Sequence, residues 1–268
     1  MAVPRPDYAI DIEKVIASKG GKVPGFIIGW VKKFFHVDFL NEFFVKGYEG
    51  VEFCTEALKY LGITLEVEGL ENVPDDGSLY TFASNHPLGG IDGVALGSLV
   101  GENFGGKVRY LVNDLLMNIK GLAPICVPIN KFGGQARELP RLINEAFESD
   151  CHMIVFPAGL CSRKIDGKVQ DIPWGKAFVT KSIATGRKVV PVHFLAENSK
   201  RFYRVAKWNK LLGIKFNVAM MLLPDEMVKA RGSVFKVVIG KPVAPETFDS
   251  SRSPYEWARL VRENVYQL

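Results

Sequence analysis

The sequence predicts an α/β fold, in which a mainly parallel mixed sheet is flanked by helices and preceded by an N-terminal helical segment. The chain has 268 residues, which is enough to bury a full core in one large domain or two small ones. Hydrophobic residues make up 47% and charged residues 24%, the balance of a folded globular protein. From Thr64 onward, short apolar runs alternate with helical patterns, and this alternation is typical of parallel strands joined by helices.

Residues 1–62 are expected to form the N-terminal amphipathic helical segment. A helical pattern covers residues 7–18, Gly20 and Gly21 interrupt it, and Pro24 stands where a proline can start the next helix. Apolar residues then recur at spacings of three and four, as on one face of a helix. These apolar positions are Phe26, Ile27, Trp30, Val31, Phe34 and Phe35, then Phe39, Leu40, Phe43, Phe44 and Val45, then Phe53, Ala57, Leu58 and Leu61.

Two interpretations of these apolar faces remain open. Aromatic stripes usually pack on the main domain, and we expect packing for most of the segment. Tryptophan, phenylalanine and lysine together are also typical of helices that lie at a membrane surface, and we expect this role for residues 30–44. We expect basic residues to assist membrane binding, although basic residues more commonly lie on a solvated helix face. The predicted contacts are Trp30, Phe34, Phe35 and Phe43, with Lys32, Lys33, Arg201, Arg204 and Lys207.

Residues 63–268 are expected to form one α/β domain, because no repeat or linker interrupts them. In such sheets, functional sites gather at the carboxyl ends of the strands. The expected strands are Thr64–Val67, Leu79–Ala83, Val108–Val112, Ile125–Ile129, Met153–Phe156, Val189–Phe194, Phe216–Met221 and Phe235–Ile239. The expected helices are Ile91–Leu99, Arg137–Glu148, Trp174–Thr185 and Pro254–Tyr266.

Composition excludes several classes of protein. The four cysteines lie far apart without a C-x-x-C pair, which argues against a disulfide framework or a zinc site and favours a reducing compartment. Neither G-x-S-x-G nor H-E-x-x-H occurs, so serine hydrolases and zinc proteases lack their usual anchors. No stretch is long and apolar enough to span a bilayer, and the first residues do not read as a signal peptide, so we expect a cytoplasmic protein. The net charge of +5 permits an anionic partner without requiring one. Three histidines, His36, His152 and His193, are expected to be structural. No metal ligand is predicted.

The loop at residues 84–93, Ser-Asn-His-Pro-Leu-Gly-Gly-Ile-Asp-Gly, is the most informative stretch. It follows a predicted strand, bends through a proline and two glycines, and leads into a predicted helix. His86 is therefore expected at a strand end. Asp92 at the helix start can hold one imidazole nitrogen and leave the other to take a proton from a substrate hydroxyl. On chemistry alone, an equally good interpretation is that the two residues cap the helix and brace the loop.

Two later segments add to this loop. Residues 151–164 run from a buried strand through a Pro/Gly turn to Arg163 and Lys164, which suggests a site for an anion or a lipid head group. Residues 189–194 form an apolar strand that contains Pro191, as expected where strand pairing ends near a cleft or an edge.

Taken together and in this order, the segments resemble the glycerophospholipid acyltransferase family, whose members acylate lysophosphatidate, glycerol phosphate and related lysolipids. The resemblance covers roughly residues 65–240. Asn85-His86-Pro87 with Asp92 resembles the block that carries the family's catalytic pair, and residues 129–132, with Lys131, lie where its second block is expected. Phe156-Pro157-Ala158-Gly159 with Ser162-Arg163 resembles the acceptor-binding block, and the stretch around Pro191 resembles the last block.

The sequence departs from the family pattern in both main blocks. Five residues separate His86 from Asp92 where the family usually has four, so the glycines must reshape the turn if the pair is to meet. Ala158 and Cys161 stand where the family has a glutamate and an arginine, and the loss of that arginine removes a phosphate clamp. The pattern looks closer to the bacterial haemolysin-like branch, whose relatives O-acylate lyso-ornithine or lyso-glycine lipids.

The resemblance implies a peripheral membrane O-acyltransferase of lipid biosynthesis, on the inner face of the cell membrane. It would transfer a fatty acyl group to a lysolipid hydroxyl from coenzyme A or acyl carrier protein, which are the two alternatives for the thioester co-substrate; no other cofactor is implied. His86 is the expected base and Asp92 its partner, while N–H groups near Gly89 or Gly159 stabilise the oxyanion. The expected substrate-binding residues are Asn85, Gly89, Lys131, Phe156, Pro157, Gly159, Ser162, Arg163, Lys164 and Pro191.

Two other functions stay open. The extra residue between His86 and Asp92, together with Ala158, is compatible with a lipid-binding protein that keeps the fold and has lost catalysis. A thioester hydrolase is the other alternative, distinguished by whether water suffices as the acceptor. Nucleic-acid binding is the least supported, because the aromatic residues lie on apolar helical faces and do not alternate with a basic stripe.

Overall fold

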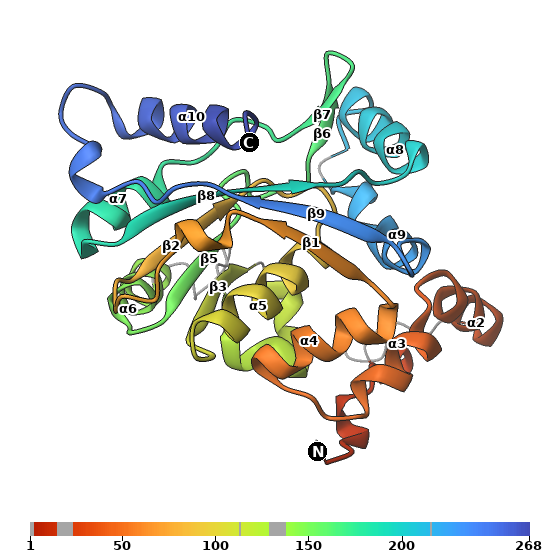
Figure 1. Cartoon of the computed structure of the whole chain (residues 1–268). Coiled ribbons are helices and arrows are strands. Elements are labelled where there is room, and N and C mark those ends of the chain that lie inside the picture. The colour runs from red at the N-terminus through yellow and green to blue at the C-terminus, as the bar shows by residue number, and fades with distance from the viewer. Residues whose placement is uncertain (1–2, 15–23, 113, 129–137, 215) are drawn as a thin grey trace.

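A computed structural model describes residues 3–14, 24–112, 114–128, 138–214 and 216–268. Within these residues, seven strands form one sheet in the order β1-β9-β8-β2-β5-β3-β4 (Figure 1). Neighbouring strands are parallel except for β8 and β9, so the predicted mainly parallel mixed sheet is confirmed. The strands are β1 (Thr64–Glu68), β2 (Tyr80–Ser84), β3 (Val108–Val112), β4 (Cys126–Pro128), β5 (His152–Val155), β8 (Lys188–Leu195) and β9 (Val234–Ile239).

Helices cover both faces of this sheet and create two apolar cores. On one face, α4 (Gly50–Leu61) and α5 (Ile91–Asn103) pack against β2, β8 and β9. On the other face lie α6 (Leu139–Glu148), α7 (Ala177–Thr185) and α10 (Pro254–Val265). Every residue of the central strand β2 is buried, as a strand covered on both sides requires. This is why a continuous apolar run predicted it well.

The N-terminal helices divide between the core and the surface. The structure has α2 (Gly25–Phe34) and α3 (Val37–Phe44), with His36 between them in the left-handed conformation at φ 52°. Phe43 is only 4% exposed, because its ring packs against those of Phe53 and Tyr60. The expected membrane contact of Phe43 is therefore wrong. Part of the helical pattern expected over residues 7–18 lies outside the described residues.

Several elements differ from the prediction in the second half of the chain. The strand expected at Phe216–Met221 is wrong: a 3₁₀ helix occupies Val218–Leu222, because Ala219 and Leu222 pack with buried residues of a neighbouring helix. Among the α-helices and strands of the described residues, four were not predicted by the sequence patterns. These are the antiparallel hairpin β6 (Arg163–Ile165) and β7 (Lys168–Gln170), and the helices α8 (Lys200–Leu211) and α9 (Leu223–Lys229).

Pro191 lies where the pairing of β8 with β9 ends, whereas the pairing of β8 with β2 continues past it. It lies buried inside β8, in register with Ala83 of β2. Its missing N–H is tolerated because β9 pairs with β8 only from Val192 onward, and the chain beyond β9 returns to β8 at a separate bridge between Val189 and Val243.

No helix in the described part of the chain is long and apolar enough to cross a bilayer. The boundary expected after residue 62 falls between α4 and β1, and the division of the chain at that point stays a prediction.

Candidate active site

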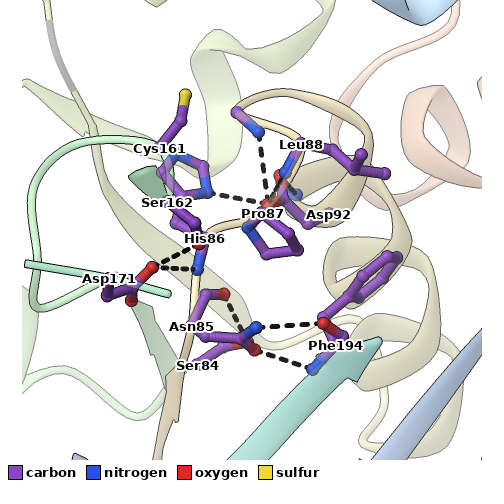
Figure 2. Close-up of polar contacts among 12 residues, drawn as sticks. Ser84, Asn85, His86, Pro87, Leu88, Asp92, Cys161, Ser162, Asp171 and Phe194 are labelled. Atoms are coloured by element: carbon purple, nitrogen blue, oxygen red, sulfur yellow. Dashed lines mark hydrogen bonds and ion pairs between the residues drawn. The ribbon is translucent and has the colours of Figure 1, made fainter. Parts of the chain in front are cut away.

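The candidate site begins where the chain leaves β2. Asn85 follows the last residue of the strand and is 3% exposed. Its side-chain oxygen accepts from the N–H of Phe194 at 2.7 Å, and its NH₂ group donates to the carbonyl of Phe194 at 2.9 Å. These two bonds imitate one more step of the pairing between β2 and β8 (Figure 2). Asn85 therefore fixes the direction of the loop, which favours a positioning role over direct substrate contact.

His86 and Asp92 meet despite the five residues between them. His86 Nδ1 lies 3.0 Å from Asp92 Oδ2, and the aspartate is fully buried in the first turn of α5 (Figure 2). The carboxylate also accepts from the N–H groups of Leu88, at 2.9 Å, and Gly89, at 3.2 Å. A carboxylate can only accept, so Nδ1 carries the proton and donates it. The lone pair of the imidazole is then on Nε2.

Gly89 permits this turn for two physical reasons. Its φ of +76° is a conformation that side chains other than glycine rarely adopt. A Cβ atom there would lie 2.3 Å from Cys161 Sγ and 3.0 Å from a methyl carbon of Leu223. The loop therefore accommodates its extra residue because Gly89 adopts a positive φ and lies in close contact with Cys161 and Leu223.

The two side chains shift the pKa of each other. Burial on its own lowers the pKa of His86, but the nearby carboxylate of Asp92 outweighs it and the pKa is raised. Burial raises the pKa of Asp92, but His86 and the N–H groups of Leu88 and Gly89 outweigh this effect and the pKa is lowered. Both shifts favour imidazolium beside carboxylate, which is the charge state created when His86 takes a proton.

The second predicted block lies against the first. Phe156, directly after β5, stacks on the imidazole of His86 with ring centroids 4.1 Å apart. The N–H of Ser162 donates to the carbonyl of His86 at 2.7 Å. The carbonyl of Pro157 accepts from the N–H of Gly175 at 2.9 Å, and Gly159 is exposed with φ +66°. The structure thus brings together residues that lie 70 or more positions apart in the sequence.

The predicted cations occupy different positions. Arg163 is half-buried and donates from Nη1 to the carbonyl oxygens of Cys161, at 2.6 Å, and Ser162, at 3.2 Å. It is close enough to His86 to oppose the rise of its pKa. Lys164 is exposed on β6, and Lys131 lies outside the described residues.

Neither glycine singled out for oxyanion binding has a free N–H. That of Gly89 donates to Asp92, and that of Gly159 donates to the carbonyl of Phe156 at 2.9 Å. The tight turns use these two N–H groups, so the prediction of oxyanion donors near Gly89 or Gly159 stays a prediction for the neighbouring N–H groups. In the described residues no group of three or more His, Cys, Asp or Glu side chains is arranged to hold a metal ion.

A family model for acyltransferases matches residues 11–268 of the chain. The chain belongs to this acyltransferase family. It is 50% identical over 267 residues to a lyso-glycine lipid O-acyltransferase of Phocaeicola vulgatus, covering 97% of this chain and 95% of that protein. It is 49% identical over 267 residues to a protein of the same name from Bacteroides thetaiotaomicron, covering 97% and 98%. The expected family and enzyme class are confirmed.

A solved structure is also similar, that of the 1-acyl-sn-glycerophosphate acyltransferase PlsC from Thermotoga maritima. It is 21% identical with a TM-score of 0.49, and the match covers 81% of this chain and 77% of that one.

Two further side chains of this acyltransferase lie close to the pair. Burial raises the pKa of the Cys161 thiol to about 12, so it stays protonated and is a poor nucleophile. Asp171 is fully buried and accepts from the N–H of His86. The sequence analysis missed Asp171, because a lone aspartate after a polar strand carries no signal of burial; only the packing around it reveals its place.

Proposed function

We propose that this acyltransferase transfers a fatty acyl group from an acyl thioester to the hydroxyl group of a lysolipid, and that the acceptor is a lyso-glycine lipid. Two relatives that are named lyso-glycine lipid O-acyltransferases are about half identical to the chain over nearly the full length of both proteins. The acceptor loop, which comprises residues 156–164, has Cys161 where a phosphate-binding arginine is usual. This suits an acceptor without a phosphate group.

The observation that carries the proposal is the hydrogen bond between His86 Nδ1 and Asp92. Nε2 takes the proton of the acceptor hydroxyl while the oxygen attacks the thioester carbonyl. The C–S bond then breaks, and the imidazolium returns the proton to the leaving thiolate, so the products are an ester and a thiol. Asp92 holds the imidazole in the required tautomer and stabilises its positive charge. Because burial raises the pKa of the Cys161 thiol, this cysteine does not carry the acyl group in the proposed mechanism.

The proposal includes a membrane surface as partner, on the cytoplasmic face. Exposed apolar residues gather on α2 and at the end of α8, and Phe34 of α2 packs against the cluster that contains Phe202 of α8. Helix α8 carries five basic and no acidic residues, although Arg201 pairs with Asp225. Apolar and basic side chains on one surface suit an anionic bilayer. The most exposed apolar residues of α2, of the end of α8 and of the segment just after it are Phe26, Trp30, Trp208, Leu211, Leu212 and Phe216.

The activity is tested with purified protein, radiolabelled acyl-CoA or acyl carrier protein, and three acceptor conditions. We expect a lyso-glycine lipid to give the acylated product at a rate about tenfold or more above lysophosphatidate. Without an acceptor, the thioester should persist. Thioester consumption that needs no acceptor would identify a hydrolase, and lipid binding without turnover would identify an inactive lipid-binding protein.

The membrane partner is tested by sedimentation with anionic vesicles. We expect Phe26→Ala/Trp30→Ala and Leu211→Ser/Leu212→Ser each to reduce the bound fraction about threefold or more, because each pair supplies exposed apolar area. Ile183→Ala is the control, since Ile183 is exposed on α7, away from both segments. Unchanged binding by both double variants would contradict this part of the proposal.

A further inference from the structure

Asp171 is a buried carboxylate that the mechanism above does not use. It follows β7 and is fully buried, and no ion pair within the described residues includes it. One carboxylate oxygen accepts from the N–H of His86 at 3.3 Å and from the hydroxyl of Ser162 at 2.6 Å. The other accepts from the indole N–H of Trp174 at 2.9 Å. Burial raises the pKa of Asp171, but each of its oxygens faces an N–H that can only donate, and these donors favour the ionised form.

These contacts join the two loops of the site. The N–H of Ser162 donates to the carbonyl of His86, while Asp171 binds the N–H of His86 and the hydroxyl of Ser162. The peptide groups on both sides of the His86 side chain are thus held by the acceptor loop and by Asp171. Figure 2 shows Asp171 and Asp92 on different sides of His86. Asp92 holds the imidazole of His86 through Nδ1, and Asp171 holds the same residue through its backbone N–H.

The C-terminal helix holds Asp171 in turn. The hydroxyl of Tyr266 accepts from the N–H of Asp171 at 2.7 Å, and Arg262 donates to the backbone carbonyl of Asp171 at 2.6 Å. Helix α10 is itself fixed at its start by a capping box between Ser253 and Glu256. The arrangement therefore connects the end of the chain to the loop of His86.

We infer that Asp171 is a second carboxylate for the His86 base: a positioning residue that fixes the His86 loop on the acceptor loop and adds negative charge beside the imidazolium. This inference rests on the proposed role of His86. The charged groups around the imidazole are Asp92 from α5, Arg163 from β6 and Asp171 after β7. Both carboxylates favour the protonated imidazole and Arg163 opposes it.

The test compares Asp171→Asn/Trp174→Phe with Trp174→Phe alone. Asparagine keeps one oxygen for His86 and Ser162, but its NH₂ group would face the indole N–H of Trp174, and the phenylalanine removes this conflict. The two variants then differ chiefly in the charge at position 171. We expect the double variant to lose about tenfold to a hundredfold in kcat, with the KM for the acceptor within about twofold.

The pH profile separates this role from a merely structural one. The base acts when neutral, so the acidic limb of the profile follows the pKa of His86, and removal of a neighbouring negative charge lowers that pKa. We expect the acidic limb to move to lower pH by about half a unit or more. A double variant with the kcat and the acidic limb of Trp174→Phe overturns the inference. A lower kcat with an unmoved acidic limb also overturns it, since a structural defect alone gives that result.

A second pair of variants covers the case in which asparagine at a buried site prevents folding. Tyr266→Phe removes the acceptor for the N–H of Asp171, and Tyr255→Phe on the exposed side of α10 is the control. We expect kcat to fall about threefold to tenfold for Tyr266→Phe alone. Equal kcat values overturn the inference. His86→Ala in the same assay distinguishes failure of the proposed function from failure of this inference. An active His86→Ala variant refutes the proposed function. An inactive His86→Ala variant, together with Asp171 and Tyr266 variants that match their controls, refutes only this inference.

Discussion

The loops after β2 and β5 lie against each other, but they are built differently. In the loop of residues 85–92, Asn85 and Asp92 are buried and paired with backbone groups, and Gly89 packs tightly under Cys161. In the loop of residues 156–164, Gly159 and Lys164 are exposed, and a Cβ atom on Gly159 would meet no atom within 4 Å. Under the proposed function, we expect the first loop to fix the geometry of the reaction and the second to leave room for the acceptor. Substitutions in the first should change kcat, and those in the second should change KM.

The largest effect is expected from Asp92→Asn. An amide cannot accept at both atoms as the carboxylate does, so the tautomer of His86 and the positive charge that forms on it are no longer stabilised. We expect kcat to fall about 10²-fold to 10⁴-fold at a similar KM, measured by steady-state acyl transfer. Asp166→Asn is the control, because Asp166 is exposed in the turn between β6 and β7, where asparagine also accepts φ 49°. A kcat for Asp92→Asn close to that of the control would break the comparison.

The two glycines sharpen the comparison, because both have positive φ. In Gly159→Ala only the backbone is strained, and we expect the free energy of unfolding to fall by about 1 kcal/mol. In Gly89→Ala the new methyl group also collides with Cys161 and Leu223. We expect a loss of about 2–4 kcal/mol and a kcat at least about tenfold lower. Urea unfolding and acyl transfer measure both quantities, and equal losses for the two variants would contradict the difference between the loops.

The pH dependence tests the first loop by itself. In the proposed mechanism His86 is a base in its neutral form, and Asp92 raises its pKa against the effect of burial. Activity should therefore fall about tenfold for each pH unit below that pKa, with an inflection above the ordinary value of about 6.5. The measurement is kcat/KM from pH 5 to 9 with the wild-type chain. A profile without an acidic limb would contradict the role of His86 as the base.

The smallest effect is expected at Lys164 in the second loop. Under the proposed function, we expect its exposed ammonium to attract the carboxylate of a glycine head group, so Lys164→Ala should raise the KM for the acceptor about threefold to tenfold and leave kcat unchanged. Lys168→Ala is the matched control, because Lys168 lies opposite Ile165 in the hairpin and so projects from the other face than Lys164. A fall in kcat without a change in KM would place Lys164 in the chemistry instead.

The sequence predicted the parts of the fold whose signal is local. Strands such as β2 and β8 are buried apolar runs, and their pattern depends little on the rest of the chain. The strands β6 and β7 have three residues each and are largely polar, so periodicity did not reveal them. The Asp166-Gly167 pair between them is a strong hairpin signal that would have identified the turn.

The sequence predicted those site residues that belong to a local motif, such as the pair His86 and Asp92 and the segment from Phe156 to Arg163. His86 and Asp92 share one loop, so their contact followed from the turn and the helix start. Asp171 is 85 residues from His86 and carries no motif, so its place depends on the packing of β7 and α10. The engagement of the Gly89 N–H with Asp92 also depends on the exact turn, which a glycine permits without specifying it.

The most direct test of the central claim is the kcat of His86→Ala with a lyso-glycine lipid acceptor, measured beside the wild-type chain at equal thermal stability. The account predicts a loss of at least about 10³-fold, because no other group within the described residues is placed by these contacts to take the proton from the hydroxyl. A folded His86→Ala variant that retains about a tenth of the wild-type kcat would contradict it.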